Sequence, residues 1–104
     1  MLVKVRKTTE ERFDIDVNFP LYFKITPESP YDDIEYHMIN VDDEGNIYAK
    51  EISFGKNCSV SISYDIIGNT NYTVDYYYFS NTGRSINESL WIEKLNAAKS
   101  AIGI

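Results

Sequence analysis

The sequence predicts a single α+β domain, residues 1–104, in which an antiparallel β-meander of five to six strands carries one C-terminal amphipathic helix. The meander is expected as a curled sheet or a small sandwich. Apolar and polar residues alternate with a period of two through most of the chain, as in strands with one solvent-facing side. The period becomes helical only after Gly83. With 104 residues and 43% hydrophobic residues, the chain can bury one core.

Seven segments have the composition of strands. The clearest is 58–67, where apolar residues occupy the even positions from 58 to 66 and serines or Asp65 occupy the odd positions between them. The other predicted strands are about 2–7, 12–17, 19–26, 34–41, 47–54 and 72–80. Pro20 donates no backbone hydrogen bond, so strand 19–26 begins there or lies at an edge. Segment 72–80 has aromatic residues on both sides, which predicts a strand covered on both faces.

Glycines punctuate this pattern between the candidate strands, where a positive φ is needed. They are Gly45, Gly55, Gly68 and Gly83. Residues 68–71, Gly-Asn-Thr-Asn, are expected to form a hairpin loop between strands 58–67 and 72–80.

A helix is expected at about 86–102. Ser85 and Glu88 have the spacing of a capping box, which would satisfy free N–H groups of the first turn. Apolar residues then recur at helical spacing from Trp91 onward, and Gly103 ends the pattern. The apolar stripe of this helix is expected to pack on the sheet.

The segment 29–54 has three interpretations. In the first, strands 34–41 and 47–54 form a hairpin with a turn at 42–46. In the second, Ser29 and Pro30 begin a helix that is followed by a turn without a ligand. The third is a metal site. The hairpin is favoured because Gly55 leaves little room for a helix after residue 49, and because Tyr48, Ile52 and Phe54 alternate as in a strand.

The metal-site interpretation depends on residues 40–51, which resemble the twelve-residue calcium loop of the EF-hand family. The resemblance implies that Gly45 makes the sharp turn and that Glu51 supplies two oxygen atoms. The complete ligand set that it implies is Asn40, Asp42, Glu44, Asn46 through its backbone, and Glu51. Beyond this calcium loop, the sequence predicts no cofactor.

Negative charge is concentrated in one part of the chain. The formal net charge is −6, and residues 28–51 contain eight acids and one base, Lys50. The only grouped bases lie between Lys4 and Arg12. An acidic segment of this kind attracts a basic protein surface and repels phosphate backbones, so a nucleic-acid partner is not expected.

The residue inventory does not predict an enzyme. His37 is the only histidine and Cys58 the only cysteine, and Cys58 belongs to the apolar row of its strand, which predicts a buried thiol rather than a Cys–His pair. A single cysteine excludes an internal disulfide, and no apolar run approaches the length of a membrane span. We therefore expect a cytoplasmic protein without a membrane partner.

The predicted function is protein recognition, as an accessory, inhibitor or immunity-type protein. Fifteen aromatic residues include tyrosines that can anchor an interface. The expected contact residues are acids of the segment 28–51 together with one tyrosine: Asp32, Asp33, Glu35, Asp42, Asp43, Glu44 and Tyr77. The alternative is a structural subunit of a virion, pilus or appendage, which would oligomerise by pairing strand 58–66 with another chain.

Overall fold

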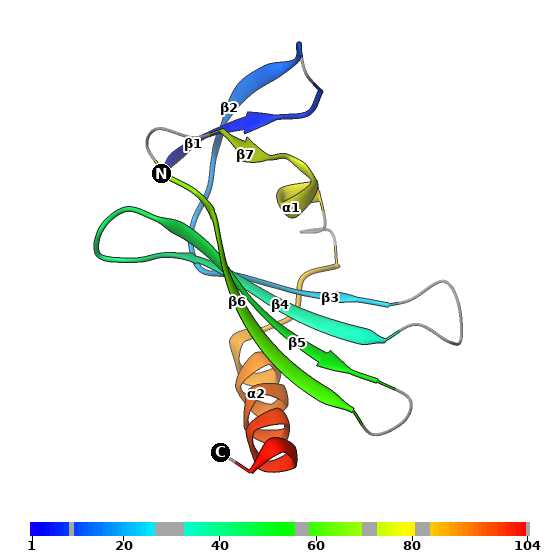
Figure 1. Ribbon diagram of the computed structural model, residues 1–104. Coiled ribbons are helices and arrows are strands. Elements are labelled where there is room, and N and C mark those ends of the chain that lie inside the picture. The colour runs from blue at the N-terminus through cyan, green and yellow to red at the C-terminus, as the bar shows by residue number, and fades with distance from the viewer. Residues whose placement is uncertain (9, 27–32, 56–58, 70–72, 81–83, 104) are drawn as a thin grey trace.

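The computed structural model describes residues 1–8, 10–26, 33–55, 59–69, 73–80 and 84–103. The domain is α+β, as predicted, with two mostly antiparallel sheets and a C-terminal helix (Figure 1). Over the described residues the two sheets contain seven strands, rather than the five to six of a single meander.

The larger sheet is a four-stranded antiparallel meander in the order β3-β4-β5-β6. Its strands are β3 (Leu21–Ile25), β4 (Ile34–Val41), β5 (Ile47–Phe54) and β6 (Val60–Gly68). The predicted hairpin at 34–54 is confirmed, since β4 and β5 pair along their full lengths. Gly45 has a φ of +83° in the connecting turn, a conformation that favours glycine. The helix interpretation of this segment is therefore wrong for its described residues, 33–54.

The smaller sheet has the order β2-β1-β7, and its strands are β1 (Leu2–Arg6), β2 (Arg12–Asp16) and β7 (Val74–Asp75). Strand β7 runs parallel to β1 and is followed by the short helix α1 (Tyr77–Ser80). The predicted strand 72–80 is thus wrong beyond Asp75. The Asp75 carboxylate accepts a hydrogen bond from the backbone N–H of Tyr77 at 3.0 Å, which turns the chain out of the strand.

The predicted hairpin between β6 and β7 does not form, because these strands belong to different sheets. Gly68 is the last, buried residue of β6 and lies within the strand rather than in a turn. Cys58 and Tyr72, at the predicted starts of these strands, lie outside the described residues.

Helix α2 (Glu88–Ile102) begins two residues later than the capping box predicts. Its N-cap is Asn87, whose side-chain oxygen accepts a hydrogen bond from the backbone N–H of Leu90 at 2.8 Å. Ser85 instead forms a backbone bridge with Phe23 of β3, which holds this segment extended. Gly103 ends the helix in the left-handed conformation, as expected. In the described ranges, no helix has the length and hydropathy needed to cross a membrane.

Two hydrophobic cores lie on opposite faces of the four-stranded sheet. On one face, Phe23, Ile39 and Ala49 pack with side chains of the smaller sheet and with Phe79 of α1. On the other face, Tyr36 and Ile52 pack against Trp91 and Ala98 of α2. Figure 1 shows the smaller sheet and α2 on these two sides. The four-stranded sheet therefore carries both the hairpin turn at 42–46 and His37.

Candidate functional site

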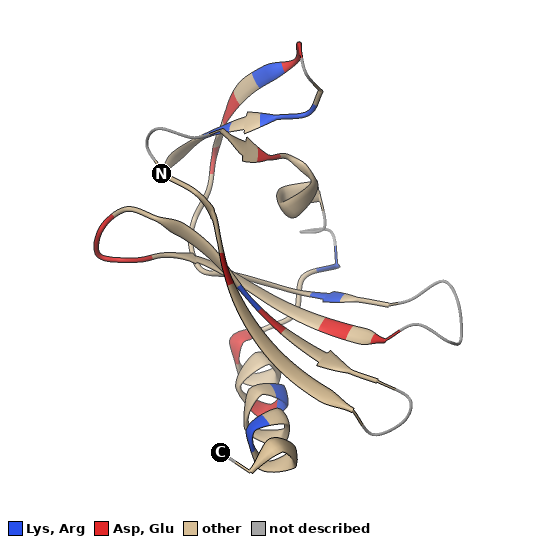
Figure 2. Cartoon of the chain, viewed as in Figure 1, with Lys and Arg blue, Asp and Glu red and all other residues tan. Residues whose placement is uncertain are grey.

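The acidic residues expected to form one partner surface are divided between the two ends of the β4–β5 hairpin. Asp42, Asp43 and Glu44 lie in the turn, whereas Asp33 and Glu35 lie at the start of β4 (Figure 2). A strand rises about 3.3 Å per residue, so roughly 25 to 30 Å separates the two groups. Asp32 lies outside the described residues. The structure therefore does not gather these side chains into one surface.

Several of these carboxylates already have partners in the fold. Asp42 accepts hydrogen bonds from the backbone N–H groups of Glu44 and Asn46, both at 2.9 Å, and so stabilises the turn. Asp33 accepts a hydrogen bond from the hydroxyl of Ser53 at 3.0 Å. Asp43 and Glu44 are exposed at the tip of the turn, where they present charge to solvent.

The five residues of the EF-hand resemblance do not assemble as its loop. Asn40 lies in β4 and Glu51 in β5, and their positions in the register place them on opposite faces of the sheet. The side chain of Asn40 accepts a hydrogen bond from the backbone of Val41, and the backbone carbonyl of Asn46 accepts one from the N–H of Asp42. This geometry contradicts the loop that the resemblance implies.

Tyr77 is exposed, as expected of a contact residue, with 60% of its surface accessible. It lies on α1, outside the four-stranded sheet that carries the acidic turn. The structure therefore does not place Tyr77 beside Asp42, Asp43 and Glu44.

Exposed aromatic and aliphatic side chains do lie beside the acidic turn, on the α2 side of the sheet. The rings of Tyr48 and Tyr64 stack with centroids 4.9 Å apart, and Ile66 is paired with Tyr48 in the register. Tyr64 is 56% exposed and Ile66 is 53% exposed. We call these three residues, with Asp42, Asp43 and Glu44, the aromatic–acidic surface.

The aromatic part and the acidic part of this surface interact electrostatically. The pKa of Tyr64 is raised by desolvation, by the negative charge of Asp42 and by the neighbouring Tyr48. The phenol of Tyr64 is thus close enough to the turn for the carboxylate to act on it.

Sequence reasoning did not identify Tyr64 and Ile66, because both belong to the apolar row of strand 58–67 and were expected to be covered. Helix α2 covers only one end of that row, where Val60 and Ile62 pack into the second core.

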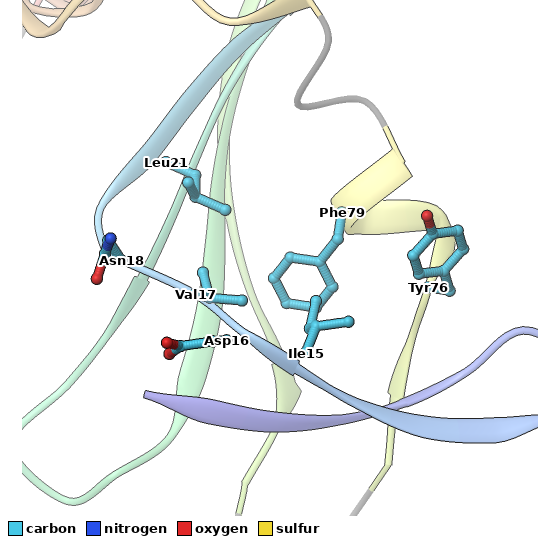
Figure 3. A pocket seen from close by; sticks show the side chains of 7 residues that line it. All are labelled: Ile15, Asp16, Val17, Asn18, Leu21, Tyr76 and Phe79. Carbon is cyan, nitrogen blue, oxygen red and sulfur yellow. The ribbon is translucent and has the colours of Figure 1, made fainter.

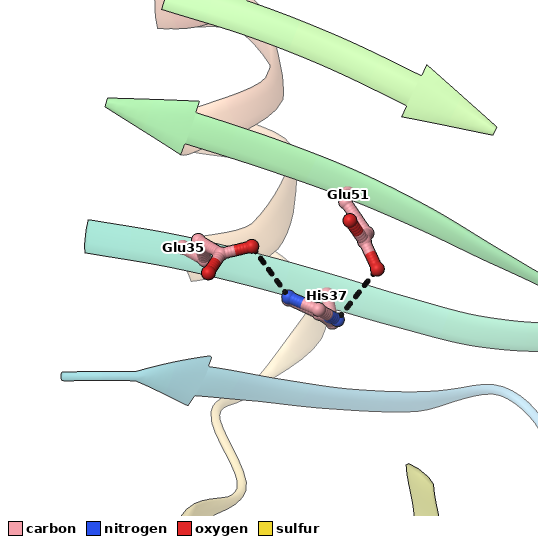
Figure 4. Close-up of side chains that lie close together, drawn as sticks. All are labelled: Glu35, His37 and Glu51. Carbon is pink, nitrogen blue, oxygen red and sulfur yellow. Dashed lines mark hydrogen bonds and ion pairs between the residues drawn. The ribbon is translucent and has the colours of Figure 1, made fainter. Parts of the chain in front are cut away.

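A second group of polar side chains lies on the opposite face of the sheet. His37 of β4 is 6% exposed, and its Nε2 atom lies 3.3 Å from a carboxylate oxygen of Glu35. Its Nδ1 atom lies 3.5 Å from a carboxylate oxygen of Glu51, the residue opposite His37 on β5 (Figure 4). We call Glu35, His37 and Glu51 the histidine cluster.

The residues around the histidine cluster hold the imidazole ring in place and carry negative charge. The ring of Phe23 stacks on His37 with centroids 5.0 Å apart. Burial raises the pKa of the Tyr78 phenol, and the charges of Asp65 and Glu51 raise it further. In the described part of the chain, the ion-pair partners of His37 are the two carboxylates. Cys58, for which the sequence predicts a buried thiol rather than a pairing with His37, lies outside the described residues.

A pocket of about 380 Å³ lies between the β2–β3 connection and α1 (Figure 3). Its walls are mainly apolar and aromatic, with Val17, Leu21 and Phe79 among them. Its one carboxylate, on Asp16, accepts a hydrogen bond from the amino group of Met1 at 2.9 Å. The described side chains that line this pocket include no serine, cysteine, lysine or histidine, and we assign no chemistry to it.

Comparison of the chain with protein-family models, with curated proteins and with solved structures finds no match.

Proposed function

We propose that this chain is a non-enzymatic protein-interaction domain that binds a basic protein surface through its aromatic–acidic surface. The observation that carries the proposal is the stacked Tyr48–Tyr64 pair with Ile66, which is exposed beside three acids of the hairpin turn. An accessory, inhibitor or immunity-type role in the cytoplasm is consistent with this recognition mode.

The physical properties of this surface suit a protein partner. Tyrosine supplies a large contact area at low entropic cost, and the stacked rings on a paired strand are already ordered before binding. The turn contributes negative charge, which speeds the encounter with a basic surface. The same charge opposes a phosphate backbone, so a nucleic-acid partner is not part of the proposal.

The direct test is selection of binders from a displayed library of peptides and small domains, with the full chain as bait. Binders are expected to be basic, and their association rates are expected to fall as salt rises. Replacing Tyr64→Ser should weaken these binders by about tenfold or more, since exposed aromatic anchors dominate such interfaces. The double change Asp43→Lys and Glu44→Lys should slow association and reverse the salt dependence.

Matched controls change the same residue types elsewhere on the surface. Tyr77→Ser removes an exposed tyrosine on α1, and Glu93→Lys reverses an exposed charge on α2. Neither is expected to alter binding. If selected binders retain full affinity for the Tyr64→Ser and charge-reversed variants, the proposed surface is not the binding surface.

A second candidate function is self-assembly through β6, as a structural subunit. Among the described strands, β6 is hydrogen-bonded only to β5, and residues 61 and 63–66 are exposed along it. Such an edge is a template for pairing with another chain.

Light scattering after size exclusion tests this candidate over a wide range of protein concentration. Edge pairing predicts a dimer or larger species that forms with rising concentration and is insensitive to salt. The double change Ser61→Lys and Ser63→Lys should return the chain to a monomer, because charge on an edge strand opposes pairing. A wild-type chain that stays monomeric at every concentration contradicts this candidate.

A further inference from the structure

The histidine cluster has the composition of a transition-metal site. An imidazole and two carboxylates come from adjacent strands, and one ligand atom from each side chain can be chosen so that all lie within 4.8 Å of one another. Zinc takes nitrogen and oxygen ligands at about 2.0 to 2.2 Å, which places neighbouring ligand atoms of a tetrahedral site about 3.4 Å apart. The distance from His37 Nε2 to the Glu35 carboxylate oxygen, 3.3 Å, is of this size. The 3.5 Å distance to Glu51 is measured from the other ring nitrogen, Nδ1, and is not an edge of the same tetrahedron.

The charge of the cluster favours a bound cation. Glu35 and Glu51 place two carboxylates around one imidazole, and Asp65 adds negative charge nearby, as its effect on Tyr78 shows. No lysine or arginine of the described residues forms an ion pair with either glutamate. Lys50, next to Glu51 on β5, projects from the opposite face of the sheet. A divalent cation would neutralise both carboxylates at once.

The fold also restricts the ligands before any ion binds. His37 is held between β3 and β5 and stacked under Phe23, so its ring has little freedom to rotate. The two glutamates are partly exposed and approach different ring nitrogens. An ion on one nitrogen therefore requires one glutamate to rotate toward it, a movement that its exposed side chain permits.

We infer that Glu35, His37 and Glu51 bind a divalent cation of the zinc class, with solvent completing the coordination. Three protein ligands and an open position are the pattern of zinc sites that remain accessible to another molecule. The site lies on the face opposite Tyr48 and Tyr64. It is therefore separate from the aromatic–acidic surface, and an experiment that contradicts one of the two proposals does not contradict the other.

The experiment is calorimetric titration of ZnCl₂ into the full chain after removal of metals with a chelator, repeated with CoCl₂ in a visible absorption spectrometer. We expect one ion per chain and the d–d absorption of low-symmetry Co²⁺. Glu51→Gln and His37→Gln should each weaken binding by more than about tenfold, since each removes one of three protein ligands. Because His37 is buried, far-UV circular dichroism is used to check that each variant folds. If His37→Gln does not fold, Glu51→Gln still tests the site, because the side chain of Glu51 is partly exposed.

Two controls separate this site from other sources of affinity. Glu44→Gln removes a carboxylate from the hairpin turn, and Cys58→Ser removes the only thiol, which is a common zinc ligand. Neither should change the affinity. Absence of saturable binding at millimolar zinc would overturn the inference, as would binding that survives Glu51→Gln or is abolished by Cys58→Ser. Nitrogen-15 spectra that show both ring nitrogens of His37 protonated and unchanged by zinc would instead identify an imidazolium held between two glutamates, which also overturns it.

Discussion

Replacing Ala98→Glu is expected to release α2 from the four-stranded sheet. Ala98 is fully buried against Tyr36, Ile52 and Trp91. Lys94, one turn earlier on α2, holds its Nζ atom 5.5 Å from the centre of the Tyr36 ring. The substitution overfills the site and buries a carboxylate, which could pair with Lys94 only if that side chain left the Tyr36 ring; we expect a cost of about 3 kcal/mol. A domain of this size has a total stability of about 5 to 15 kcal/mol, so much of it would be lost.

The single tryptophan reports this event directly, because Trp91 is buried in the same core. Its fluorescence emission should shift to longer wavelength in the variant, and the urea midpoint should fall. Ala101→Glu is the matched control, one turn nearer the end of the helix at an exposed position. It should cost less than about 1 kcal/mol, the usual size of an unfavourable charge near a helix C-terminus. Equal losses in the two variants would show that α2 does not depend on this contact.

Replacing Phe23→Ala is expected to lower the free energy of unfolding by about 3 to 5 kcal/mol, as for other buried phenylalanines. Phe23 is 1% exposed, belongs to the core under the smaller sheet and stacks on His37. The cavity left behind removes contacts from both the core and the imidazole. The histidine cluster should therefore lose its fixed geometry together with the stability of the sheet.

Urea unfolding of Phe13→Ala provides the comparison. Phe13 lies on β2 with 38% of its surface exposed, and its ring lies 5.4 Å from that of Tyr76. Its truncation should cost about 1 to 2 kcal/mol, because less apolar surface returns to water. If the two truncations lower stability equally, the assignment of Phe23 to the core is incorrect.

The turns and helix ends that depend on a few neighbouring residues could be predicted from the sequence. The turn at 42–46 was predicted because glycine and acidic residues separate two alternating runs, and β4 and β5 pair there in full. The end of α2 was predicted because Gly103 adopts a left-handed conformation at little cost. The N-cap was misplaced by two residues because both Ser85 and Asn87 are suitable capping residues, and only the bridge between Ser85 and Phe23 selects Asn87.

The structure of segment 72–80 could not be predicted correctly from its pattern. Its residues do alternate as in a strand, but the strand with which it pairs is distant in the sequence. Val74 pairs in parallel with Val5, nearly seventy residues earlier, and that pairing extends over two residues only. The hydrogen bond from the Tyr77 N–H to the Asp75 carboxylate then competes with continuation of the strand. The length of β7 thus depends on how far β1 extends beside it, which no local pattern reveals.

By itself, the sequence determined the α+β class, the alternating strands, the amphipathic helix and the excess of negative charge, because each of these follows from neighbouring residues along the chain. Only the tertiary structure decided which side chains meet. It divided the acids between two ends of one hairpin, left Tyr64 and Ile66 uncovered where α2 does not reach, and placed Glu51 opposite His37. The reason is physical: strand register and helix placement are set by contacts between segments far apart in the chain, and those contacts create the surfaces on which any function depends.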